Sequence, residues 1–132
     1  MNAYLVGVAL ATGAALFAHW LGLDRERGFY PTVLTVIAFL YSLFAVMGGS
    51  NEALLRELAA GLVFVGMVVV GFRRSLWWVV AGLALHGVFD FFHPHLIEDP
   101  GVPPWWPAFC LAYDVVAAAG LAWLIRRGTI RA

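Results

Sequence analysis

The run NAYLVGVALATGAALFAHWLGL at residues 2–23, closed by the charged turn DRERG at residues 24–28, decides the fold. Such a run can cross a membrane as a single helix, because a spanning helix needs about 20 mostly apolar residues. It has neither the basic start nor the small-residue cleavage site of a signal peptide. We therefore expect it to remain as a helix of the mature protein.

Four further apolar runs follow, separated by short polar or proline-containing segments. They predict helices over residues 30–47, 52–72, 75–92 and 105–125. Asn51 is the expected N-cap of the third of the five helices. Pro94 is expected to end the fourth, because the residue before a proline is disfavoured in the helical region. The sequence thus predicts an all-α fold, a single-domain bundle of five transmembrane helices.

The composition excludes a soluble globular domain. Of the 132 residues, 63% are hydrophobic and 12% are charged, whereas soluble domains are about 45–50% apolar and about 25% charged. The formal net charge is zero, so no basic surface points to nucleic acid as a partner. The chain has one cysteine, Cys110, which excludes an internal disulfide and any metal site that needs two thiolates.

The positions of the arginines predict the orientation in the membrane. Seven of the eight lie at the expected inner ends of the helices: Arg25, Arg27, Arg73, Arg74, Arg126, Arg127 and Arg131. Arginines in short loops are retained on the cytoplasmic side. We therefore expect a multi-pass protein of the bacterial inner membrane, with its N-terminus outside and its C-terminus in the cytoplasm. Arg56 is the exception and needs a local explanation.

The fourth and fifth predicted helices carry polar residues at depths where the bilayer is apolar. His86, Asp90 and His93 are spaced at i, i+4 and i+7, which places them on one face of a helix. Asp114 lies about 13 Å below the predicted outer boundary, at about 1.5 Å per residue. A charge at the centre of a spanning helix costs about 2.5–3.5 kcal/mol, so each of these residues needs a partner or a function.

Charge counting predicts a bound cation among these residues. Glu57, Asp90 and Asp114 outnumber Arg56, and an apolar environment does not tolerate the excess without protonation or a cation. Neutral imidazole and carboxylate together suit a divalent transition metal: zinc, iron, manganese or copper. The predicted ligands are His86, Asp90, His93 and Asp114. Glu57 is then available as a general base, and Arg56 can hold an anionic head group or a developing oxyanion.

Several residues also have structural explanations. A protonated Asp114 could hydrogen-bond Tyr41, protonated histidines could balance the carboxylates, and Cys110 is expected to act as a small apolar side chain. A haem between His19 and His86 is improbable, because their depths differ by about 15 Å.

The remaining polar and small residues have expected places at the edges of the bundle. His95, Glu98 and Asp99 fall in the predicted outer loop, where they can gate access. The small residues of the first helix form a packing stripe that is also a candidate homo-oligomer contact: Ala3, Gly7, Ala11 and Ala15.

The last two predicted helices carry a recognisable series of motifs. His86-Gly87-Val88-Phe89-Asp90 is followed by His93-Pro94-His95 and by Pro104-Trp105-Trp106-Pro107-Ala108-Phe109-Cys110, continuing to Asp114. This series resembles a family of small bacterial integral membrane proteins without an established activity. The resemblance implies an integral membrane protein and assigns no reaction.

Three functions fit the predicted site. The first is a metal-dependent enzyme acting on a membrane lipid or a small amphiphile, the second is a proton- or metal-cation-linked transporter or channel, and the third is a structural subunit of a larger membrane complex. An enzyme predicts a site closed toward the cytoplasm. A transporter predicts a polar path that continues inward.

Overall fold

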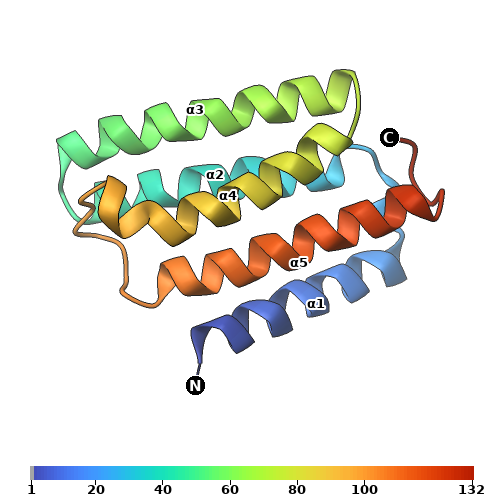
Figure 1. Cartoon of the computed structure of the whole chain (residues 1–132), viewed down its shortest axis with the longest axis horizontal. Coiled ribbons are helices and arrows are strands. Elements are labelled where there is room, and N and C mark those ends of the chain that lie inside the picture. Colours follow the sequence, from blue (N-terminus) through green and yellow to red (C-terminus); the bar gives the residue numbers. More distant parts are fainter. Residues whose placement is uncertain (1) are drawn as a thin grey trace.

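The computed structural model describes residues 2–132, which form long helices lying side by side with short connections (Figure 1). The helices are α1 (Ala3–Leu21), α2 (Phe29–Met47), α3 (Asn51–Arg73), α4 (Trp77–Leu96) and α5 (Trp106–Arg126), and a 3-10 helix, η1 (Leu23–Arg25), follows α1. The prediction of an all-α chain with five long helices is confirmed.

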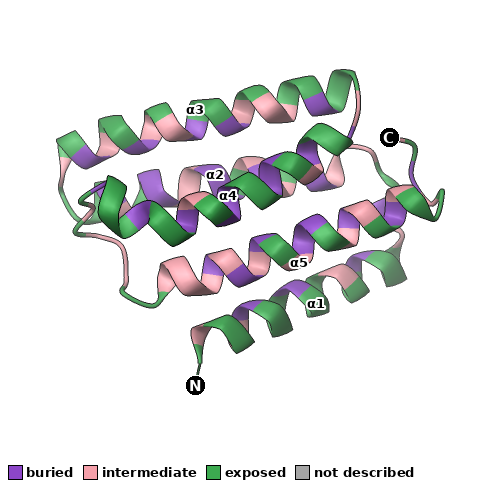
Figure 2. Ribbon diagram, in the orientation of Figure 1, coloured by how far each residue is buried: buried purple, intermediate pink, exposed green. Residues whose placement is uncertain are grey.

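Four of these helices are long and apolar enough to cross a membrane: α1, α2, α3 and α5. The chain is therefore a multi-pass helical membrane protein. The outer faces of the bundle are exposed along its whole length, as expected of surfaces that meet lipid (Figure 2). Helix α4 is not among the four helices that are apolar enough to cross, and its buried face carries His86, Asp90 and His93. A fifth span through α4, and the orientation of the chain in the membrane, stay predictions.

The helices pack so that α5 lies between α1 and α4, while α3 contacts both α2 and α4. One end of the bundle holds the N-terminus, the α2–α3 turn and the α4–α5 loop (Figure 1). The other end holds η1, the α3–α4 turn and the C-terminal residues. We call these the acidic end and the arginine end, because Glu52, Glu98 and Asp99 lie at the first and the seven clustered arginines at the second.

Two predicted helix boundaries were wrong. Helix α4 continues through Pro94 to Leu96, and the backbone N–H of Ile97 donates to the carbonyl of His93 at 3.0 Å. A proline this close to a helix end removes one helical hydrogen bond, which the remaining turn tolerates. Helix α3 is capped by Ser50 instead of Asn51, since the Ser50 hydroxyl accepts from the backbone N–H of Ala53 at 3.1 Å.

The arginine half of the bundle has an apolar core. Its fully buried members come from three helices and from the turn before α4: Leu34, Leu76, Val79, Leu83 and Leu121. The Arg27 side chain closes this end by donating to the carbonyls of Phe72 at 3.0 Å and Gly71 at 3.3 Å, near the C-terminus of α3. A cation at this position also interacts favourably with the helix dipole.

Candidate metal centre

Four metal-capable side chains meet between α4 and α5. His86 and Asp90 come from α4, and Cys110 and Asp114 come from α5. One ligand atom from each lies within 4.8 Å of the others, and all four residues are at most 2% exposed. Both pairs are spaced at i, i+4, so each helix presents its two side chains on one face. We call these four residues the inner cluster.

The backbones approach closely at this level because α4 has a glycine next to its histidine. A Cβ atom at Gly87 would lie 3.2 Å from the side chain of Leu111 and 3.6 Å from the Cβ of Asp114. A side chain at this position would therefore require Leu111 to shift by a few tenths of an ångström. Local small-residue packing of this kind lets the polar side chains of two spanning helices reach each other.

His86 is the centre of the inner cluster. Its Nδ1 is hydrogen-bonded to Oδ2 of Asp114 at 2.6 Å and lies 3.5 Å from Oδ2 of Asp90. The sulfur of Cys110 is 4.0 Å from both carboxylate oxygens of Asp114. Tyr41 on α2 donates its hydroxyl to Oδ1 of Asp90 at 2.7 Å. Within residues 2–132, Oδ2 of Asp90 is buried without a hydrogen-bond partner, which leaves one acceptor free for a cation.

The second buried polar group is a pair that lies toward the acidic end. Nε2 of His93 is hydrogen-bonded to Oε1 of Glu57 at 2.5 Å, and both residues are almost fully buried. The ring of His93 stacks on Tyr41 with ring centroids 3.8 Å apart. Tyr41 therefore contacts the inner cluster through its hydroxyl and the His93–Glu57 pair through its ring.

The structure changes the predicted ligand set. His86, Asp90 and Asp114 do come together, but His93 is bonded to Glu57, and Cys110 is the fourth member of the group. Cys110 is packed in the hydrophobic core, as expected of a small apolar side chain, but its sulfur also lies beside the carboxylate of Asp114. Its i, i+4 spacing from Asp114 is the sequence signal that could have indicated a shared site.

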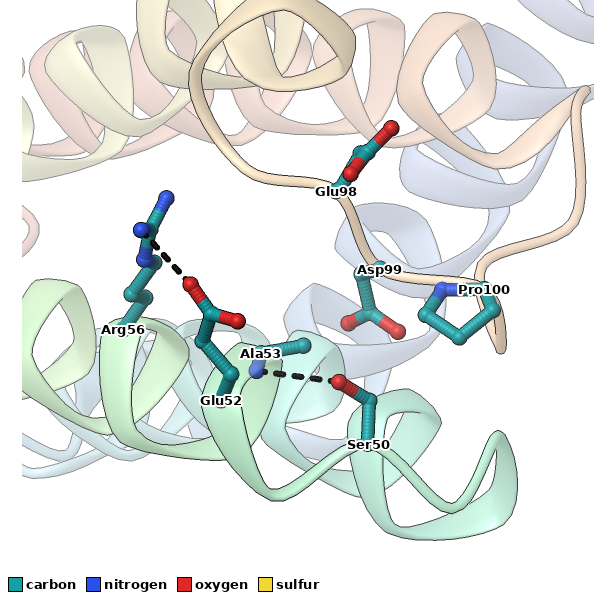
Figure 3. Close-up of a pocket in the computed structure, with 7 residues that line it drawn as sticks. All are labelled: Ser50, Glu52, Ala53, Arg56, Glu98, Asp99 and Pro100. Atoms are coloured by element: carbon teal, nitrogen blue, oxygen red, sulfur yellow. Dashed lines mark hydrogen bonds and ion pairs between the residues drawn. The ribbon is translucent and has the colours of Figure 1, made fainter.

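Arg56 lies at the surface. Its side chain is 57% exposed and binds Glu52 at 2.8 Å. It lines a pocket of about 470 Å³ at the acidic end together with Glu98 and Asp99 (Figure 3). Within residues 2–132 it makes no hydrogen bond or ion pair with the inner cluster, and its predicted role on an anion stays a prediction. His95 is exposed.

The buried charges remain unbalanced in the part of the chain that the structure describes. In the inner cluster and the His93–Glu57 pair, three carboxyl groups accompany two imidazoles, while the fourth buried carboxyl group, that of Asp24, lies at the arginine end. A divalent cation or protonation must therefore compensate them. The nitrogen, oxygen and sulfur donors of the inner cluster fit a transition metal such as zinc better than magnesium or calcium.

The other predicted histidine site is separate. His19 lies at the arginine end, where its Nδ1 is 2.7 Å from Oδ2 of the buried Asp24. His19 and His86 thus have different carboxylate partners, Asp24 and Asp114. No family model, curated protein or solved structure matches this chain. The chemistry of the site is therefore argued from its geometry.

Proposed function

We propose that this protein is a membrane metalloenzyme that binds one divalent transition metal at the inner cluster and acts on a lipid or a small amphiphile. The observation that carries the proposal is the convergence of four ligand atoms within 4.8 Å at residues that are at most 2% exposed. Burying two carboxylates, an imidazole and a thiol in a membrane is costly unless a cation or protons balance them. A metal bound there would polarise a substrate carbonyl or phosphoryl oxygen, or lower the pKa of a bound water.

The residues around the cluster suit this role. Tyr41 orients Asp90 through its hydrogen bond, as residues behind a ligand commonly do. The His93–Glu57 pair can take up a proton on the acidic side of Tyr41. On the arginine side, the apolar residues Leu34, Leu83 and Leu121 close the bundle. This closure supports an enzyme, because a transporter needs a polar path through that half.

An apolar groove supports an amphiphile as the substrate. It has a volume of about 320 Å³ and lies between α2 and α5, lined mainly by aromatic and aliphatic side chains that include Val33, Leu40 and Phe109. Cys110 lines the same groove, and its sulfur is 4.0 Å from Asp114. A hydrocarbon chain in this groove would thus lie beside the inner cluster.

Proton- or cation-linked transport is the second candidate. It is favoured by the contacts that join Glu57 and His93 through Tyr41 to Asp90 and then to His86. A series of ionisable groups within a membrane protein is typical of proton relays. The apolar closure toward the arginine end ranks this candidate second.

The test is metal analysis of the purified protein by plasma mass spectrometry, before and after incubation with zinc, iron, manganese or copper. We expect close to one metal per chain, and loss of that metal in the Asp90→Ala and Asp114→Ala variants. The matched control is Asp24→Ala, which removes a buried aspartate that is also paired with a histidine, at the other end of the bundle. No stoichiometric metal, or equal loss in the control, would refute the proposal.

The enzymatic part has its own test. The metal-loaded protein is incubated with a membrane lipid extract, and the products are identified by mass spectrometry beside the metal-free protein and Asp114→Ala. We expect a lipid product that forms only with the loaded protein. Metal binding without any product, together with proton or metal flux into vesicles, would favour the transporter instead.

A further inference from the structure

Helices α2 and α3 lie side by side (Figure 1), and a groove between them opens at the arginine end. Its volume is about 440 Å³, and its α3 side consists of Val68, Val69, Phe72 and Arg73. Its α2 side extends to Thr35, which is about 9 Å from the start of that helix at about 1.5 Å per residue. We call this the α2–α3 groove.

The apolar wall of the α2–α3 groove is open to the surroundings. Val69 and Phe72 are each 48% exposed, on a helix that is long and apolar enough to cross a membrane. The Thr35 hydroxyl already donates to the carbonyl of Pro31 at 2.8 Å. A hydrocarbon chain lying along the groove would therefore cover apolar surface and leave no hydroxyl of Thr35 without an acceptor.

Arg73 provides a positive charge at the open end of this groove. It is the last residue of α3 and is exposed. Val69 precedes it by four residues, so an apolar side chain lies one turn below the charge on the same face of the helix. Within residues 2–132, the arginine side chains that form hydrogen bonds are those of Arg27 and Arg56, which leaves Arg73 available to a ligand.

The charge around Arg73 favours an anion. Seven of the eight arginines of the chain lie at the arginine end, where the acidic side chains are Asp24 and Glu26. Asp24 is buried and paired with His19. The arginine end therefore has an excess of positive charge, which is complementary to an anionic membrane surface.

We propose that the α2–α3 groove binds an anionic phospholipid, with its phosphate on Arg73 and one hydrocarbon chain along Val69 and Phe72. Arginine suits this role because its planar guanidinium can donate two parallel hydrogen bonds to phosphate oxygens. Basic pockets between spanning helices are typical sites for acidic lipid head groups. The order of charge and apolar surface along α3 matches the order of head group and chain in a lipid.

A lipid in this groove would be a bound component of the protein and not the substrate of the proposed enzyme. The groove includes no residue of the inner cluster, which lies between α4 and α5. The inference thus goes beyond the proposed function and does not depend on it. Asp114→Ala, which removes a proposed metal ligand, should leave lipid binding unchanged.

The experiment is native mass spectrometry of the whole chain, purified in an uncharged detergent and titrated with dioleoyl phosphatidylglycerol. Dioleoyl phosphatidylcholine is the ligand control, because it has the same chains and no net charge. We expect saturable binding of about one phosphatidylglycerol per chain, at least about tenfold tighter than phosphatidylcholine. Glycerol phosphate, which has no chains, should not displace the lipid, because it buries no hydrocarbon in the groove.

Two neighbouring arginines give a matched pair of variants. Arg73→Gln should weaken phosphatidylglycerol binding at least about tenfold, because it removes the donors to the phosphate. Arg74→Gln removes the same charge from the next residue, which is exposed but does not line the groove, and should change binding less than about threefold. Thr35→Phe fills the apolar part of the groove and should also weaken binding, with the charge unchanged. Circular dichroism checks that the helices are retained in each variant.

Four outcomes would overturn the inference. Equal binding of the two lipids would indicate unselective contact with hydrocarbon, and displacement by glycerol phosphate would indicate a site for a free phosphate. Equal effects of Arg73→Gln and Arg74→Gln would indicate diffuse attraction to the arginine end. Loss of lipid binding in a helical Asp114→Ala variant would place the lipid at the inner cluster. Zinc binding is measured on the same samples, so failure of this site is distinguishable from failure of the inner cluster.

Discussion

At the scale of single residues, Tyr41 holds the two buried polar groups together. It is 1% exposed, donates its hydroxyl to Asp90 at 2.7 Å and stacks its ring on His93. Because Tyr41 is so deeply buried, water cannot take the place of its hydroxyl as a donor to Asp90. Removing the hydroxyl therefore leaves a carboxylate oxygen of Asp90 unpaired. Such a loss is costlier than the hydrogen bond itself.

We therefore predict that Tyr41→Phe lowers the free energy of unfolding by about 1–3 kcal/mol. The ring and its stacking on His93 are kept, so the change isolates the hydroxyl. Thermal unfolding in detergent, followed by circular dichroism, measures it. The control is Tyr4→Phe, which removes an exposed hydroxyl from α1 and should leave the midpoint unchanged. Equal midpoints for both variants would show that the Asp90 contact contributes nothing.

The sequence was sufficient to find three of the four members of the inner cluster. His86, Asp90 and Asp114 are conspicuous because ionisable residues are expensive within spanning helices. Cys110 was missed, since a thiol costs little to bury and gives no such signal. Asp99 was assigned only to a gating loop, because its place in the pocket beside the first turn of α3 depends on tertiary contacts.

At the scale of elements, α1 is attached to the bundle through small residues. Gly7 and Ala11 are buried at the contact with α5. A Cβ atom at Gly7 would collide with the carbonyl oxygen of Phe109 and with the side chain of Ala112. The predicted packing stripe is therefore used within the chain. A homo-oligomer stays a prediction, but its contact would need another face.

Gly7→Val should consequently loosen α1 from α5 and lower the free energy of unfolding by about 1–3 kcal/mol, the usual cost of overpacking against an unyielding neighbour. Gly13→Val is the matched control on the same helix, because a Cβ at Gly13 meets nothing within 4 Å. Thermal unfolding of the two variants side by side is the measurement. If Gly13→Val destabilised the protein as much, the effect would come from valine in the helix and not from packing.

The helices themselves were predictable, whereas the cap of α3 and the end of α4 were not. Apolar length located all five, because each has to satisfy its own backbone hydrogen bonds in lipid. The end of α4 was misplaced at Pro94, since the local preference of the residue before a proline is outweighed by the burial of His93 against Glu57 and Tyr41. Local rules fail here because a tertiary contact decides the boundary.

At the scale of the whole molecule, the two ends of the bundle differ in charge and in contents. The arginine end holds seven arginines and a closed apolar core, whereas the acidic end holds the pocket with Glu52, Glu98 and Asp99. Arginines in short loops are retained in the cytoplasm. We therefore predict that the acidic end, with its pocket, faces outward.

Glu26→Cys and Glu98→Cys test this orientation, since each replaces an exposed glutamate in a connection at one end of the bundle with a thiol. The native Cys110 is 2% exposed and adds little background. In intact cells, a membrane-impermeant maleimide should label Glu98→Cys and spare Glu26→Cys, and lysis should make both react. The opposite pattern would reverse the topology and place the pocket of the acidic end on the cytoplasmic side. The same result for both variants in intact cells, whether both are labelled or both are spared, would mean that the helices between the two connections do not alternate as predicted, as when α4 does not cross the membrane.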